Sequence, residues 1–327
     1  MTNNQLIRAT RPFAKEFRRL SWFHTLSTLS LMAATYLVIF WCPILGLQIL
    51  ASIILGLIIV RMFIIYHDYM HRAILQRSWL AKFIFTIYGY FILAAPSVWK
   101  RSHNYHHKHN SKLYSSSIGS FPVVTKEKFL AASKTEQRIY LFIRHPFTIA
   151  FGYLFTFIYG MSILSLVRNP RKHWDSAIAL VFHILLGTVI YSFFGWLGLV
   201  LGFFIPYLIS HALGSYLFYA QHNFPDVTFK DKEGWTYISA ALESSSYMKM
   251  SPIMHWFTGN IGYHHIHHVN EAIPFYRLPE AYAKIPALQD AKTTSLNPVE
   301  IRRCFQLKVW APEENRMIGI KGLGMSS

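Results

Sequence analysis

The chain has 327 residues, of which 53% are hydrophobic and 17% aromatic, and its formal net charge is +17. The apolar residues are concentrated in long uncharged runs, which argues against ordinary soluble domains and indicates membrane-spanning segments. The positive charge is better explained by membrane topology and anionic lipid headgroups than by nucleic acid, because no nucleic-acid-binding motif accompanies it.

The N-terminal part predicts a basic interfacial segment followed by a helical hairpin. Residues 1–24 combine arginines with aromatic side chains, as segments at headgroup level do. Two spans follow at about residues 25–42 and 45–66, and Arg61 is the one formal charge inside them. We expect this arginine to snorkel toward the interface.

The second span ends where the first notable histidines begin. About twenty residues at ~1.5 Å each give ~30 Å, which is one hydrocarbon thickness. His67 and His71 are therefore expected to emerge where the helix leaves the bilayer.

Two further apolar stretches, residues 79–95 and 146–167, have an ambiguous relation to the membrane. One full crossing by the first would place His103 on the opposite side from His67. We therefore predict interfacial or re-entrant helices, with Pro96 ending the first. If each stretch crosses fully, a common metal site fails.

Residues 176–221 contain no Lys, Arg, Asp or Glu, and predict a second hairpin. Its spans are expected at about residues 176–194 and 196–220, with a tight turn near Gly195. The short connections of both hairpins lack Lys and Arg, whereas the N-terminus is basic, so the positive-inside rule places both termini in the cytoplasm.

The predicted fold class is an all-α integral membrane protein of the inner (cytoplasmic) membrane. It has four transmembrane helices in two hairpins, interfacial helices, and a cytoplasmic helical cap that carries a histidine-rich dimetal site. The main domain is expected over residues 25–315, and residues 316–327 form a polar tail.

Three histidine clusters repeat at three or four residues, so on helices their imidazoles share a face. The clusters are His67/His71, His103/His106/His107 and His264/His267/His268. Eight imidazoles exceed the roughly six positions of one octahedral ion, which implies two metals. Imidazole suits iron, copper, nickel and zinc; an all-nitrogen site beside lipid favours iron and oxygen chemistry.

A metal-bound imidazole needs a partner for its second ring nitrogen. The side chains expected to provide it are Asp68, Asn104, Asn223 and Asn260.

At these clusters the chain resembles the integral-membrane fatty acid desaturases. His-Asp-Tyr-Met-His at 67–71, His-Asn-Tyr-His-His at 103–107 and His-His-Ile-His-His at 264–268 look like the three boxes of that family. The likeness, to bacterial acyl-lipid desaturases of the omega-side type, continues at residues 219–224 and 256–263 and covers roughly residues 40–315. Tyr69, Met70 and Gln221 depart from the usual pattern and bear on the surroundings of the ligands and the substrate position.

The resemblance implies a non-haem di-iron enzyme in which His222 is a ninth ligand beside the eight clustered histidines. Such an enzyme inserts a cis double bond into an acyl chain, on a membrane lipid or acyl carrier, with O2 and two external electrons. An unactivated C–H bond offers no acidity, so no catalytic residue beyond the metal ligands is expected. The electron donor is a separate protein, such as ferredoxin or a b-type cytochrome, and the basic balance predicts attraction to an acidic carrier.

Two alternatives stay open at this point. A membrane di-iron hydroxylase or carotenoid ketolase uses related histidine boxes, and product analysis separates it from a desaturase. A zinc-binding structural or transport protein belongs to another class. The uncharged spans lack a Gly/Pro-broken pair at mid-membrane, which argues against transport, and metal analysis tests for zinc.

Overall fold

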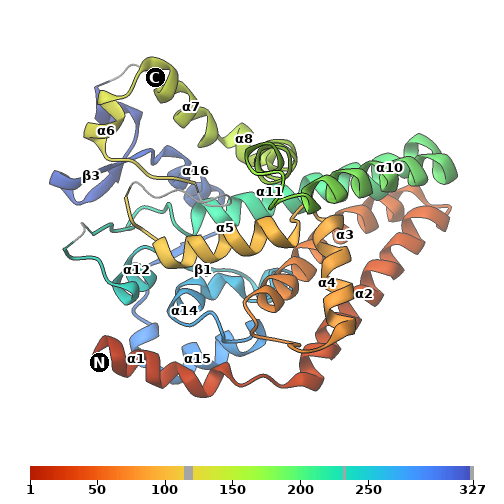
Figure 1. The fold of residues 1–327 in the computed structure, drawn as a ribbon, viewed down its shortest axis with the longest axis horizontal. Coiled ribbons are helices and arrows are strands. Elements are labelled where there is room, and N and C mark those ends of the chain that lie inside the picture. The colour runs from red at the N-terminus through yellow and green to blue at the C-terminus, as the bar shows by residue number, and fades with distance from the viewer. Residues whose placement is uncertain (114–120, 231–232, 325–327) are drawn as a thin grey trace.

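The structure is a computed structural model that describes residues 1–113, 121–230 and 233–324. Long helices extend to one side of the molecule, and shorter elements form a compact cap on the other (Figure 1). Both termini lie at the cap end. The chain is mostly helical, and its apolar helices identify it as a membrane protein.

The part formed by the long helices also contains a bent pair and two wider π-helical segments. Its elements are α2 (Arg18–Trp41), α3 (Leu45–Met70), α4 (Trp79–Phe91), α5 (Pro96–His109), η2 (Tyr153–Ile163), α9 (Leu164–Arg168), α10 (Asp175–Leu199), η3 (Val200–Phe204) and α11 (Ile205–Ala220).

The cap, which we define as the remaining described elements, is built from short helices and four short strands. Its helices are α1 (Asn3–Thr10), η1 (Arg11–Ala14), α6 (Lys126–Ala131), α7 (Lys134–Ile143), α8 (Pro146–Ala150), α12 (Tyr237–Glu243), α13 (Pro252–Phe257), η4 (Ile261–Tyr263), α14 (His264–Val269), η5 (Phe275–Arg277), α15 (Leu278–Lys284), η6 (Pro286–Leu288), α16 (Pro298–Gln306), η7 (Pro312–Glu314) and η8 (Ile320–Leu323). Its strands are β1 (Tyr247–Lys249), β2 (Thr293–Ser295), β3 (Val309–Ala311) and β4 (Arg316–Ile318).

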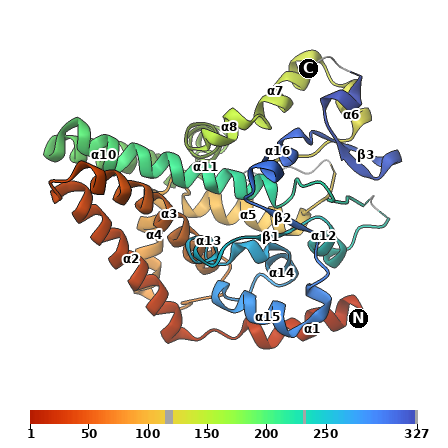
Figure 2. The same cartoon turned by 180° about the vertical axis from the view of Figure 1, so that it is seen from behind.

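These strands depart from the expected all-α fold. β1 and β2 pair in parallel, and β3 and β4 pair antiparallel. Figure 2 shows the first pair beside α13 and α14. The strands are too short to show the alternating pattern that reveals a strand in a sequence. The β1–β2 pair ties residues 293–295 to the segment that precedes the third histidine cluster, whereas β3 and β4 form a local pair near the C-terminus.

Three helical segments of the described chain are long and apolar enough to cross a membrane: Arg18–Trp41, Leu45–Met70 and Asp175–Ala220. The last one reverses direction. Gly195 has a φ of 63°, and the His183 and Tyr207 rings lie 4.7 Å apart. A continuous helix at ~1.5 Å per residue would separate them by about 36 Å. The chain therefore folds back near Gly195.

Helices α4 and α5 form the bent pair, with an angle of 88° between them. The sequence suggested that Pro96 ends the first helix, and this prediction is wrong. Helix α4 already ends at Phe91, Leu93 adopts a positive φ of 56°, and Pro96 is the first residue of α5. Proline suits that position because its missing N–H would have no helical partner there.

The bend leaves carbonyl groups at the end of α4 without helical partners. Side chains from α3 and α11 donate to them: Tyr66 Oη to the Ala94 carbonyl (2.9 Å), Tyr207 Oη to the Phe91 carbonyl (2.6 Å) and His211 Nε2 to the Ile92 carbonyl (3.2 Å). Because an unsatisfied carbonyl in an apolar setting is costly, these bonds stabilise the bend and fix the start of α5.

Arg61 does not snorkel to the interface. Its side chain is only 3% exposed and donates to Thr28 Oγ1 (3.2 Å), His24 Nδ1 (3.1 Å) and the Trp256 carbonyl. Its guanidinium also lies 4.2 Å from the centre of the Trp256 ring. Acceptors from α2 and α13 are within reach, so the arginine joins α3 to both elements instead of extending to solvent.

Candidate metal centre

Three helices and one helix end bring the predicted ligands together. Helix α3 delivers its pair of histidines at its C-terminal end, α5 carries its three into the cap, and α14 presents its three from the C-terminal third. His222 follows the end of α11. Within each element the spacing of three or four residues keeps the imidazoles on one face.

The first group consists of five buried histidines whose nitrogens converge. They are His67, His71, His103, His107 and His267, and one nitrogen of each lies within 4.8 Å of all the others. Successive Nε2 atoms are separated by 2.8 Å (His67 to His103), 3.1 Å (His103 to His107) and 3.1 Å (His107 to His267).

The second group consists of four histidines with the same arrangement. They are His106, His222, His264 and His268. Their Nε2 atoms lie 2.9 Å apart (His222 to His264), 3.0 Å (His264 to His268) and 3.3 Å (His106 to His268). The rings of His107 and His268, one from each group, are 4.4 Å apart between centroids, so the two groups are neighbours.

This arrangement fits a pair of transition-metal ions. A metal-to-imidazole bond is about 2.0–2.1 Å, so two ligand nitrogens at a right angle are separated by about 3 Å. The observed separations of 2.8 to 3.3 Å match that value. Several lone pairs aimed at one point cannot all be satisfied by protons, whereas a cation satisfies them together. Nine imidazoles without a thiolate suit iron, copper, nickel or zinc.

Burial keeps the imidazoles of the cap in the form that binds metal. It lowers the pKa of His264, His267 and His268 well below the ordinary value, and neighbouring histidines lower each further. Burial also lowers the pKa of His222 to about 4. Neutral imidazoles at neutral pH leave one ring nitrogen free to coordinate.

Two of the Nδ1 atoms, which face away from the centres of the groups, have well-defined partners. Asp68 Oδ1 lies 3.1 Å from His67 Nδ1, and its other oxygen accepts the backbone N–H of Phe275 at 2.6 Å. His222 Nδ1 lies 2.9 Å from the Ser244 carbonyl, to which it donates. Both contacts fix a tautomer that directs Nε2 toward the centre of a group.

The three predicted asparagines lie differently. Asn104 is half-buried and lines a cavity together with His107. Asn223 bonds to Arg144 (2.5 Å) and to the Cys304 carbonyl (2.8 Å) instead of an imidazole. The remaining one, Asn260, donates to the Phe275 carbonyl at 3.2 Å and adopts a φ of 56°. Nearness in sequence to a histidine did not determine which way these amides point.

Sequence reasoning missed one carboxylate beside the centre. Glu271 Oε2 lies 3.3 Å from His71 Nδ1 and 3.5 Å from His107 Nδ1. It therefore contacts two members of the five-histidine group, which come from α3 and α5. The sequence shows an acidic residue three positions after His268. That it lies beside the Nδ1 atoms of His71 and His107 follows only when the packing of α14 on α5 is known.

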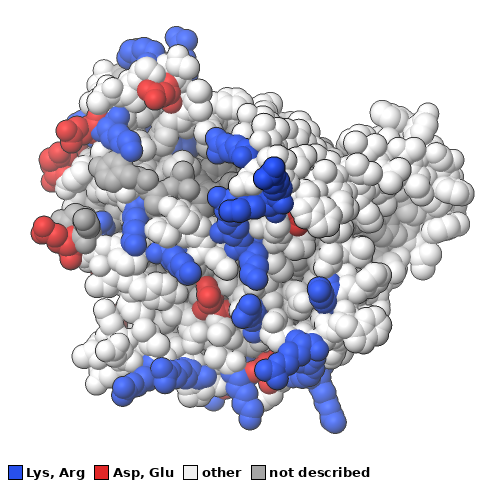
Figure 3. Space-filling view, viewed as in Figure 1, with Lys and Arg blue, Asp and Glu red and all other residues white. Residues whose placement is uncertain are grey.

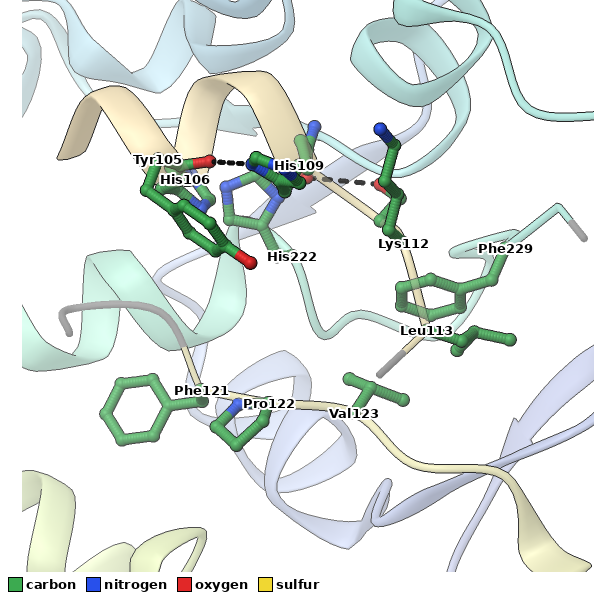
Figure 4. Close-up of a pocket in the computed structure, with 12 residues that line it drawn as sticks. Tyr105, His106, His109, Lys112, Leu113, Phe121, Pro122, Val123, His222 and Phe229 are labelled. Atoms are coloured by element: carbon green, nitrogen blue, oxygen red, sulfur yellow. Dashed lines mark hydrogen bonds between the residues drawn. The ribbon is translucent and has the colours of Figure 1, made fainter. Parts of the chain in front are cut away.

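Two cavities reach the groups from outside. The larger, of about 370 Å³, is lined by His71, His107 and Glu271. The smaller, of about 50 Å³, reaches the second group. Figure 4 shows His106 and His222 side by side there, with Phe121, Pro122 and Val123 across the opening.

The fold and the histidine groups define a helical membrane protein with a candidate dimetal centre at the base of its long helices. The sequence profile of the fatty acid desaturase family matches residues 45–298. The chain therefore belongs to that family.

Similar curated proteins agree with this assignment. A "Fatty acid desaturase" of Bacillus subtilis (strain 168) is 27% identical over 278 residues, which cover 85% of this chain and 78% of that protein. An "sn-1 oleoyl-lipid 12-desaturase" of Anabaena variabilis is 25% identical over 82% of this chain and 77% of its own. An "sn-1 acyl-lipid omega-3 desaturase (ferredoxin)" of Nostoc sp. (strain 36) is 26% identical over 67% of this chain and 62% of its own.

Proposed function

We propose that this desaturase inserts a cis double bond into a fatty acyl chain carried by a membrane lipid, using O2 and two electrons from a separate donor protein. One observation carries the proposal: nine imidazoles converge as two neighbouring groups at the base of apolar helices. The acyl-lipid substrates and the ferredoxin in the names of the relatives support the substrate class and the kind of donor.

Two iron ions would be held by the five-histidine and the four-histidine groups. Bound iron would supply the oxidising power that breaking an unactivated C–H bond requires and that no acid or base among these side chains provides. The chain itself contributes the arrangement. Asp68 orients His67, the Ser244 carbonyl orients His222, and burial of seven of the nine histidines limits the access of bulk water to the two cavities.

The proposed topology has four crossings with the cap on the cytoplasmic side of the inner membrane. The reversal at Gly195 supports two crossings in the α10–α11 segment, and α2 with α3 supplies the others. Lys and Arg are numerous over the cap, whereas the end with the long helices is free of them on the face in Figure 3. That asymmetry supports a cytoplasmic cap by the positive-inside rule.

Fatty acid profiling of a bacterial host that expresses the chain tests this function. The wild-type chain should add unsaturated acyl products that require oxygen, and His106→Ala or His267→Ala should abolish them while the protein still accumulates in membranes. His145→Asn is the matched control, because His145 is exposed, lies outside both groups and caps α8 through a bond that asparagine also makes.

Three outcomes would contradict the proposal. Unchanged unsaturation with wild-type chain in the membrane would refute desaturation, and hydroxylated lipids would identify a hydroxylase instead. Purified protein that holds zinc and no iron, with no lipid product, would indicate the zinc-binding class.

A further inference from the structure

The larger cavity connects solvent with the five-histidine group. It is lined by the buried His71 and His107 and by Glu271, whose side chain contacts both and is 43% exposed. All five imidazoles of that group are buried, and this cavity brings the surface close to two of them at once. A redox partner that docked over it would approach the metal position closely.

Three cations also line the cavity: Arg72, Lys100 and Lys108, which we call the basic rim. All three are exposed. Within the part of the chain that the structure describes, none of them makes a hydrogen bond or ion pair with a carboxylate. The one acidic side chain of the cavity, Glu271, contacts the imidazoles and interacts electrostatically with Lys108. With three cations and one carboxylate, the cavity lining has a net positive charge.

The arrangement of the two lysines along α5 favours a soluble protein as the partner over a lipid headgroup. Lys100 and Lys108 are eight residues apart on α5, about 12 Å along its axis, and both line the cavity. Helix α5 extends away from the long helices into the cap (Figure 1), and basic side chains gather over it in Figure 3. Headgroup phosphates would lie in one plane at the membrane surface, whereas these lysines follow α5 away from the long helices.

We propose that the basic rim is the docking surface for an acidic electron-carrier protein, which delivers electrons to the five-histidine group past His71 and His107. This inference rests on the proposed desaturation. In that reaction O2 takes two electrons and two protons from the two C–H bonds that are broken, two electrons from the carrier and two protons from water. These four electrons and four protons convert it into two molecules of water. Each carrier that gives one electron docks once, so two dockings complete a turnover.

The test uses the full chain in lipid nanodiscs with a plant-type ferredoxin of net negative charge as the probe. Lys100→Glu and Lys108→Glu reverse rim charges without touching the histidines. Arg302→Glu on α16 is the matched control, because it is exposed and changes the net charge by the same amount away from the cavity. Two quantities are measured at low and high salt: ferredoxin binding to nanodiscs, and the KM for ferredoxin in desaturation.

Each rim reversal should weaken ferredoxin binding and raise its KM about tenfold at low salt, with kcat nearly unchanged, because rim charges act mainly on association. The difference from wild type should shrink at high salt, where the charges are screened. Arg302→Glu should leave both quantities close to wild type. A single turnover of enzyme that has been reduced with dithionite should proceed equally in all variants.

Several results would overturn the docking surface. One is unchanged binding in the rim variants, and another is an equal loss in Arg302→Glu, which would indicate net charge alone. A raised KM for the lipid substrate with normal ferredoxin binding would assign the rim to headgroups. The binding measurement is independent of turnover. If wild-type chain made no product yet bound ferredoxin in a rim-dependent way, the desaturase proposal would fail while the docking surface stood.

Discussion

Replacing Glu271 by glutamine tests whether this carboxylate positions the five-histidine group. The change keeps the shape of the side chain and removes its negative charge. Glu271 lies 3.3 Å from His71 Nδ1 and 3.5 Å from His107 Nδ1, and its side chain is 43% exposed. Loss of a partner behind a metal ligand typically lowers metal affinity 10- to 100-fold. Partial solvent screening places the expected loss near the lower limit, about tenfold or ~1.4 kcal/mol.

The assay is iron content per chain after dialysis against a graded series of chelator concentrations. Glu271→Gln should lose about one iron at roughly tenfold less chelator than the wild type, while the iron of the four-histidine group is retained. The melting temperature without metal should stay unchanged, because Glu271 is partly exposed and its contacts are with these two imidazoles and the charge of Lys108.

Glu280→Gln serves as the control, since Glu280 on α15 is similarly exposed and pairs with Arg277 and Lys284. Wild-type iron retention in Glu271→Gln would refute the positioning role. Loss of both irons together, or a lower melting temperature without metal, would show that the residue acts on the fold instead.

Three further predictions concern stability. Arg61→Met should lower the free energy of unfolding by about 2–4 kcal/mol, measured by thermal unfolding in detergent, because one buried and two partly buried acceptors lose a charged donor. An unchanged melting temperature would contradict this. Gly152→Ala should destabilise by about 1–3 kcal/mol, since a Cβ there would overlap the Ser215 side chain. A Cβ at Gly214 would have no other atom closer than 4.0 Å, so Gly214→Ala should be tolerated. Burial lowers the pKa of Lys308 to about 8 from its ordinary 10.5, so the unfolded chain binds more protons between these values. Wild-type stability relative to Lys308→Met should therefore rise as pH increases from 8 to 10, and a flat or falling difference would refute the assignment.

The local part of the site was predictable from the sequence because it depends on helical periodicity. Pairs such as His103 and His107 share a helix face by spacing alone, and the structure contains the helices that carry them. Gly195 was also predictable, since a reversal between two apolar segments requires a residue that adopts a positive φ without strain. Both features are decided within a few residues of the chain.

Features that depend on distant packing were not predictable in the same way. Arg61 stays buried because α2 and α13 place acceptors around it, and a sequence shows only that it stands in an apolar run. Asn223 turns toward Arg144 although it follows a histidine. Glu271 approaches two imidazoles only through the packing of α14 against α5. In each case the nearest partner lies far away along the chain.

The bend between α4 and α5 links the long helices to the histidine groups. Three of the nine imidazoles are on α5, whose start is fixed by side chains that satisfy the carbonyls at the end of α4. If Tyr207 or Tyr66 lost its hydroxyl, a carbonyl would be left without a partner in an apolar setting. Continuing α4 or shifting α5 would then be favoured, because either change could give that carbonyl a new hydrogen-bond donor. A shift of α5 by one residue rotates it by about 100° and carries all three imidazoles off the common centres. The polar contacts inside the long-helix part are therefore a condition for the histidine geometry in the cap.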